Sequence, residues 1–288
     1  MPSDPSIDEL FEIRNNFYLG NFQQCINEAQ RLKSSKEETK LQRDAFLYRA
    51  YIAQRKFTIP LDEITVASGP ELQAIRLYAD YLCNPDKREE IVTDLEKQIS
   101  VGVDLSDTFL LIAGFIYAAE ENYDQALRVL YQANNLECMA LTIQCLIKMD
   151  RIDLAIKEFK KMSEKDEDAI ITQLTNAWVN MATGKDKLQD AFYIFQEMID
   201  KYGTTVMLLN AQASCLIQQQ RYDQAETLLH DALEKDSSNA EALINLTVLS
   251  QLSGKTVEVS NRYISQLKEA HRNHPWVKDY FAKVFCVF

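Results

Sequence analysis

The chain has 288 residues, of which 47% are hydrophobic and 26% are charged, as in an ordinary folded soluble protein. It contains only 7 glycines and 6 prolines, too few for the many turns of a β-rich fold, so the composition favours helices. The 43 acidic and 31 basic residues give a net charge of −12. This charge disfavours nucleic acids and anionic membranes as direct partners, because both repel an acidic surface.

The six cysteines are scattered and include no C-x-x-C motif, which favours reduced thiols over a disulfide framework. The first residues are polar and lack the apolar segment of a signal peptide. No stretch approaches the roughly 20 apolar residues needed to span a bilayer. We therefore expect a cytoplasmic chain with a disordered N-terminus at residues 1–7, which reaches membranes only through a partner.

Taken in chain order, one short phrase recurs: a large apolar residue, two mostly polar positions, a small residue, then apolar residues at helical spacing. It begins at Phe22 and returns at Tyr123, Ile152, Leu188 and Tyr222, with weaker copies over residues 57–64, 87–95 and 257–263. The small residues of the clear copies are Cys25, Ala126, Ala155, Ala191 and Ala225. The copies are spaced by about 34 residues, the period of tetratricopeptide repeats.

The phrase predicts the second helix, helix B, of a repeated helix pair. A small residue is required where helix B crosses helix A, because a larger side chain would hold the backbones apart. Residues 108–119, 206–219 and 240–252 are predicted to be A helices. Pro60 falls inside the second B helix and should shorten or kink it, and residues 65–70 should form a loop within the array.

The sequence thus predicts an all-α fold, a tetratricopeptide-like α-solenoid that forms a superhelical stack of about eight helix pairs. We expect one continuous array over residues 8–280, followed by an atypical apolar C-terminal end at 281–288. A simple helix bundle is the disfavoured alternative, because bundles carry no 34-residue period.

No residue set indicates catalysis, a cofactor or a metal, so we expect a protein that is not an enzyme. His271 and His274 are three positions apart, but no nearby cysteine or well-spaced carboxylate completes a metal site. The sequon that begins at Asn245 lies inside a predicted helix, and the glycines occur singly rather than in a phosphate-binding loop.

Binding of another protein is the remaining function, and the concave surface lined by the A helices is the predicted contact face. By repeat register this face contains Arg49, Ile52, Leu72, Ile75, Leu82, Leu111, Phe115, Ile147, Asn176, Asn180, Asn210 and Ile217. Its apolar members favour a groove for an apolar segment, and its asparagines offer amides to a partner's backbone. The alternative, that these side chains pack against neighbouring helices, remains open.

Four stretches of the chain, 8–11, 46–56, 188–198 and 261–268, closely resemble the coatomer epsilon subunit family of the COPI vesicle coat. The likeness runs from about residue 8 to about residue 280. The resemblance implies a non-catalytic coat subunit that binds and stabilises the C-terminal region of the coatomer alpha subunit, and through it joins the rest of coatomer. It also implies a role in Golgi-to-ER retrograde and intra-Golgi transport, on the cytosolic face of Golgi membranes and COPI-coated vesicles.

Two other functions compete with this one. Another tetratricopeptide adaptor or chaperone cofactor would bind a peptide in the concave groove, but a carboxylate clamp needs lysines at paired A-helix positions. Those pairs here read Leu111/Phe115, Asn176/Asn180 and Asn210/Ser214, with no cation. A helical-repeat enzyme subunit would need a metal or catalytic constellation, which the sequence does not contain.

Overall fold

The computed structural model describes residues 8–101 and 105–285, and these residues form seventeen α-helices, one short 3₁₀ helix and no strand. The N-terminal segment expected to be disordered, 1–7, and the last residues of the apolar end, 286–288, lie outside the described part. Helix α17 continues to Phe285, past the expected end of the array at residue 280. By contacts the chain divides into two compact units, Met1–Ala182 and Thr183–Phe288.

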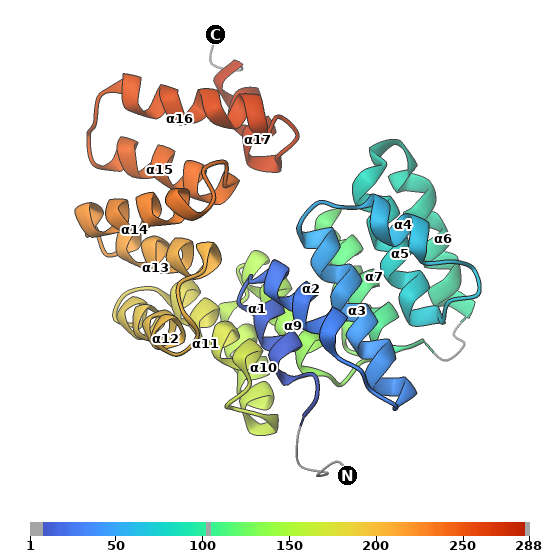
Figure 1. Ribbon diagram of the computed structural model, residues 1–288. Helices are drawn as coiled ribbons and strands as arrows, with labels where there is room; N and C mark the ends of the chain where they lie inside the picture. Colours follow the sequence, from blue (N-terminus) through green and yellow to red (C-terminus); the bar gives the residue numbers. More distant parts are fainter. Residues whose placement is uncertain (1–7, 102–104, 286–288) are drawn as a thin grey trace. The chain divides into compact units, whose positions relative to one another are not determined.

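The first unit is a stack of antiparallel helix pairs (Figure 1). Its elements are α1 (Phe11–Tyr18), α2 (Phe22–Arg31), α3 (Glu37–Ala53), α4 (Thr58–Glu63), α5 (Pro70–Cys83), η1 (Pro85–Lys87), α6 (Arg88–Val101), α7 (Asp107–Ala119), α8 (Tyr123–Leu130), α9 (Leu136–Lys148), α10 (Ile152–Lys165) and α11 (Ile170–Thr183), whose last residue belongs to the second unit. The predicted shortening at Pro60 is confirmed, because α4 has only 6 residues.

The second unit continues the same alternation. Its helices are α12 (Lys187–Tyr202), α13 (Val206–Gln218), α14 (Tyr222–Lys235), α15 (Ala240–Leu252), α16 (Val257–Ala270) and α17 (Pro275–Phe285). Helix α17 packs onto the end of the stack, where Trp276, Val277 and Phe281 contact the core of the unit. The predicted A helices over 108–119, 206–219 and 240–252 are confirmed to within one residue at each end.

Six of the turns inside the helix pairs share one conformation. A residue with positive φ follows helix A at Gly20, Arg55, Glu121, Asp150, Gln220 and Gly254, with values between 58° and 80°. The next backbone N–H then donates to a carbonyl five residues earlier, as Asn122 N does to Tyr117 O at 2.9 Å. This bond is the mark of a Schellman turn, which ends helix A, and helix B begins after three or four intervening residues.

The turns between the pairs are capped by side chains. Ser106, Asn135, Thr205 and Asn239 each precede an A helix and accept a hydrogen bond from the backbone N–H three residues later. Such caps satisfy N–H groups that have no partner inside the helix, and each stabilises its helix by about 1 kcal/mol. Short polar residues placed at the repeat period therefore set the start of successive A helices.

Helices A and B of the fourth pair approach closely at Gly114. A Cβ atom built on this residue would lie 2.6 Å from Leu130 Cδ2 and 3.1 Å from Leu141 Cδ2, well inside contact distance. Both leucines are buried, so they have little room to move away. The glycine is therefore required by the packing of α7 against α8 and α9.

We predict that Gly114→Val lowers the free energy of unfolding by about 1–3 kcal/mol, because the added methyl groups overpack this crossing. Urea denaturation followed by circular dichroism measures the change. Gly69→Val is the control, because nothing lies within 4 Å of a Cβ there. Equal stability of the Gly114 variant and the unmodified chain would contradict the close approach.

Candidate partner-binding face

The small residues of the repeat phrase lie at the helix crossings. Cys25 on α2, Ala126 on α8, Ala155 on α10, Ala191 on α12 and Ala225 on α14 are each 0% exposed. In the eighth pair Ser260 on α16 occupies the corresponding place and is also buried. Because each crossing uses the equivalent position of helix B, successive A helices turn equivalent faces away from their B helices.

The structure divides the twelve residues of the predicted contact face into two groups. Buried within the chain are Arg49, Ile52, Ile75, Leu111 and Asn210. Partly exposed are Leu72, Leu82, Phe115, Ile147, Asn176, Asn180 and Ile217. Ile75 and Leu111, at 0% and 2% exposure, belong to a large core cluster of the first unit. These two side chains therefore pack between helices, which was the alternative to a contact with a partner.

An ion pair explains why Arg49 is buried. Its guanidinium donates to both carboxylate oxygens of Glu137, with Nη1–Oε2 at 3.0 Å and Nη2–Oε1 at 2.5 Å. Arg49 lies on α3 and Glu137 lies in the first turn of α9, so the pair joins residues 88 positions apart in sequence. The first unit therefore curves so that the A-helix faces of its second and fifth pairs are in contact. Figure 1 shows α1 beside α9.

Aromatic rings surround this ion pair. The Arg49 guanidinium carbon lies 4.7 Å from the ring centre of Phe17 and 5.2 Å from that of Phe46, within cation–π distance. Further along the same faces, Tyr78 on α5 and Phe115 on α7 stack at 5.8 Å. The inner side of the first unit is thus filled largely by its own side chains.

Burial and the ion pair shape the electrostatics here. Burial acts to lower the pKa of Arg49, but the Glu137 carboxylate outweighs it and the net shift is upward, so the guanidinium stays charged. Burial, with a further contribution from Glu137, raises the pKa of Tyr18 well above its ordinary value. The cluster therefore holds one cation, one anion and a neutral phenol, a self-compensated set without a spare charge for a ligand.

Two asparagines of the predicted face lie on α11, the last helix of the first unit. Asn180 Nδ2 donates to Asn176 Oδ1 at 3.1 Å, and both side chains are partly exposed. This bond uses one donor and one acceptor, so each amide keeps further capacity for hydrogen bonds.

The A-helix face of the second unit carries a related network. Asn210 Nδ2 donates to Val206 O at 3.0 Å and to Asn239 Oδ1 at 3.3 Å, and Asn210 Oδ1 accepts from Asn245 Nδ2 at 3.4 Å. Asn210 is buried and uses both of its side-chain N–H groups in these hydrogen bonds, whereas Asn245 is partly exposed. On α15, the side-chain amide of Asn245 is therefore the one that a partner protein could reach.

Three residues of these faces were missed by the sequence reasoning. Asn245 was considered only as a sequon, although it lies 35 positions after Asn210, close to one repeat period. Leu252, 35 positions after Ile217, ends α15 and is 54% exposed. Both could have been found from the repeat register. The repeat register gave no indication of Glu137, because its ion-pair partner Arg49 lies three helix pairs earlier in the chain.

Within the described residues, the buried cysteines and the two histidines near the C-terminus lie in separate environments. Burial raises the pKa of Cys25 and of Cys215 to about 12, so these thiols stay protonated and unreactive at neutral pH. His271 contacts the Ser238 carbonyl, and His274 lies 3.3 Å from Glu241, so the two imidazoles have separate partners. Within residues 8–101 and 105–285, no three His, Cys, Asp or Glu side chains gather as metal ligands would.

None of the helices described is both long enough and apolar enough to cross a bilayer.

Comparison with known proteins gives a consistent family. The family described as Coatomer epsilon subunit matches residues 6–284. Coatomer subunit epsilon of Caenorhabditis elegans is 42% identical over 277 residues, covering 96% of this chain and 95% of that protein. Coatomer subunit epsilon-1 of Arabidopsis thaliana is 39% identical, covering 96% and 94%.

Solved structures agree on the fold. A tetratricopeptide repeat protein from Parabacteroides merdae superposes with a TM-score of 0.62 at 12% identity, covering 94% of this chain and 95% of that one. A thermophilic tetratricopeptide protein of Thermus thermophilus covers 63% of this chain and 100% of its own, with a TM-score of 0.55. The chain therefore has the all-α, tetratricopeptide-type solenoid fold expected from its repeat.

We predict that Arg49→Met lowers the free energy of unfolding by about 3 kcal/mol, because the largely buried Glu137 carboxylate, whose side chain is 19% exposed, loses its partner. Adding Glu137→Leu should recover much of the loss, since an apolar pair can replace a buried ion pair. Urea denaturation of the single and double variants measures both effects.

Arg151→Met is the matched control, because it removes an exposed ion pair with Asp153 and should change stability little. If Arg49→Met and Arg151→Met had equal effects, the Arg49–Glu137 pair would not be what closes the first unit.

Proposed function

The chain belongs to the coatomer epsilon subunit family, the family of a COPI vesicle-coat component, and we propose that it binds and stabilises the C-terminal region of the coatomer alpha subunit. Through that subunit it would join the rest of coatomer and serve Golgi-to-ER retrograde and intra-Golgi transport. It would act as a non-catalytic, cytoplasmic scaffold that reaches Golgi membranes and COPI-coated vesicles only as part of the coat. No cofactor is required for this function.

The observation that carries the proposal is the unequal character of the A-helix faces in the two units. In the first unit the Arg49–Glu137 pair and its aromatic neighbours occupy the inner side, and the other residues of the predicted face, such as Leu72, Leu82 and Phe115, are at most partly exposed. In the second unit the corresponding face keeps an accessible amide at Asn245 and an exposed apolar side chain at Leu252.

The exposed stripe on α15 has a definite chemistry. Asn245, Val248 and Leu252 follow one another at helical spacing, and all three are at least partly exposed. An amide can pair with the main chain of a partner, while Val248 and Leu252 offer apolar area that gains from being covered. A partner segment with accessible backbone groups and apolar side chains would match this stripe.

The remaining accessible residues of the predicted face, Ile147, Asn176, Asn180 and Ile217, are proposed as further contacts. Ile217 on α13 is partly buried against the core of the second unit and contributes only its outer surface. Buried members such as Ile75 would act by holding the helices in position rather than by touching the partner.

We predict that Leu252→Asp weakens binding to the C-terminal region of the alpha subunit by about tenfold or more, because a charge would be desolvated in the contact. Biolayer interferometry with the full-length chain and the purified C-terminal region measures the affinity. A pull-down from cytosol followed by mass spectrometry should recover the alpha subunit first and the other coatomer subunits with it.

Val257→Asp is the matched control: Val257 is 68% exposed in the same repeat but begins helix B, so binding should be unchanged. Equal binding by the Leu252 variant and the unmodified chain would exclude the A-helix face of α15. Recovery of chaperones in place of coat subunits would favour the adaptor function instead.

A further inference from the structure

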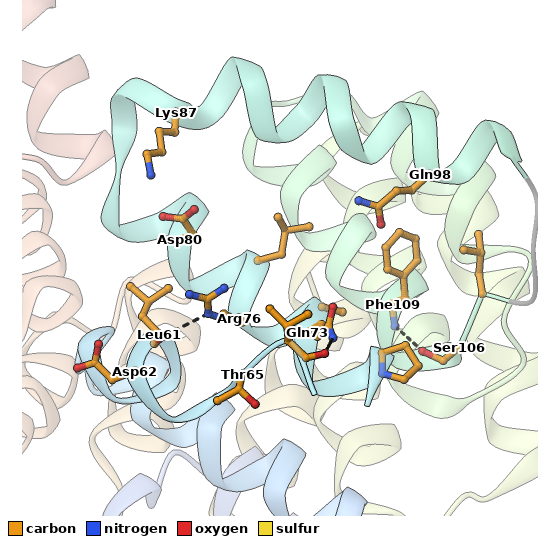
Figure 2. A pocket seen from close by; sticks show the side chains of 15 residues that line it. Leu61, Asp62, Thr65, Gln73, Arg76, Asp80, Lys87, Gln98, Ser106 and Phe109 are labelled. Carbon is orange, nitrogen blue, oxygen red and sulfur yellow. Dashed lines mark hydrogen bonds between the residues drawn. The ribbon is translucent and has the colours of Figure 1, made fainter. Parts of the chain in front are cut away.

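A pocket of about 660 Å³ lies in the first unit between α5 and α6. Figure 2 shows Asp62 and Asp80 in the same lining as Arg76 and Lys87, so charges of both signs surround the space. Amide and hydroxyl groups also line the end that contains Phe109. A lining of this mixed kind selects no single class of ligand. The end of the second unit carries a more specific feature.

Two aromatic side chains stack on α17, the last helix of the second unit. The ring centres of Trp276 and Tyr280 are 5.1 Å apart with 15° between their planes, and both side chains are partly exposed. Trp276 packs against the core of the unit, whereas Tyr280 is not among the described side chains that do so. Tyr280 also meets Phe281 edge-on, with 5.6 Å between the ring centres. The Tyr280 ring is thus held in position by other rings while part of it stays open to solvent.

The polar groups of both stacked residues are unused. The Trp276 indole N–H and the Tyr280 hydroxyl form no hydrogen bond with any residue in 8–101 or 105–285. A tryptophan or tyrosine that only fills a core usually pairs its N–H or O–H. Both residue types are also enriched at the energetic centres of protein interfaces, where the ring is covered and the polar end pairs with the partner. The stack therefore has the character of an interface anchor.

The stack adjoins the exposed stripe on α15. Glu241 lies one helical turn before Asn245, on the same side of the helix. The imidazole of His274, the residue before α17, is 3.3 Å from the Glu241 carboxylate. The start of α17, with Trp276, therefore borders the end of the stripe at which Asn245 lies. The two surfaces share a chemistry, because each combines hydrogen-bonding groups with apolar area.

We propose that Trp276 and Tyr280 anchor the same segment of the coatomer alpha subunit that covers the α15 stripe, an inference that rests on the proposed function. The segment runs from the stripe over the start of α17 and places an apolar side chain on the exposed part of the Tyr280 ring. Its main-chain carbonyl groups accept hydrogen bonds from the Trp276 N–H and the Tyr280 O–H. Because contacts within the chain already hold the stack, little side-chain freedom is lost on binding.

The first test measures binding of the purified C-terminal region of the alpha subunit to the full-length chain by biolayer interferometry. Tyr280→Ala should weaken binding about tenfold or more, since it removes the accessible ring without emptying the core. Tyr280→Phe keeps the ring and loses only the hydroxyl, so a smaller loss of about threefold is expected.

Tyr193→Ala is the matched control. Tyr193 is 60% exposed and lies beside Phe192 on the B helix α12 of the same unit, so its loss should leave binding unaltered. Thermal unfolding of each variant shows that it is folded.

Trp276 packs against the core, so it is tested without being mutated. The chain contains two tryptophans, and biosynthetic labelling with fluorotryptophan gives each of them a fluorine NMR resonance. Trp178→Phe removes one resonance and thereby assigns the other to Trp276. Addition of the unlabelled alpha-subunit region should shift the Trp276 resonance, because a carbonyl group binds its indole N–H.

Two results would overturn the anchor while leaving the coat function in place. One is equal binding of the alpha-subunit region by the Tyr280→Ala and Tyr193→Ala variants. The other is a Trp276 resonance that does not move when the complex forms. Absence of binding by the unmodified chain would instead overturn the proposed function, and the anchor with it.

Discussion

The buried ion pair between Arg49 and Glu137 is the constraint on which the arrangement of the first unit depends. In a stack of helix pairs each repeat ordinarily contacts only its neighbours, so the curvature follows from small rotations added pair by pair. Here a bidentate pair joins α3 to α9 across 88 residues, and the rings of Phe17 and Phe46 enclose the guanidinium. A one-dimensional stack is thereby fastened back on itself.

This closure has a consequence for function. Side chains that an open solenoid would present to a partner, such as Ile75 and Leu111, become part of the unit's own core. The second unit has no equivalent ion pair across its A-helix face among its described residues, and Asn245 and Leu252 stay accessible there. The same repeat thus provides a closed body in one part of the chain and an accessible A-helix face in another.

Much of the fold could be predicted because it depends on local patterns. Small residues such as Ala126 and Ala225 mark the helix crossings, and Pro60 marks a shortened helix, since each acts on its own or an adjacent element. The exposed part of the A-helix faces was harder to predict, because burial depends on which distant helices meet. The repeat register could place Arg49 on an A-helix face, but not show that Glu137 lies opposite.

Hydrogen exchange of the full-length chain, alone and with the C-terminal region of the alpha subunit, tests the central claim most directly. We expect new protection on the A helices α13 and α15, and little change over α3 and α9, where the ion pair already occupies the inner side. Protection confined to the B helices α14 and α16, or equal protection over α3 and α9, would contradict the assignment of the binding face.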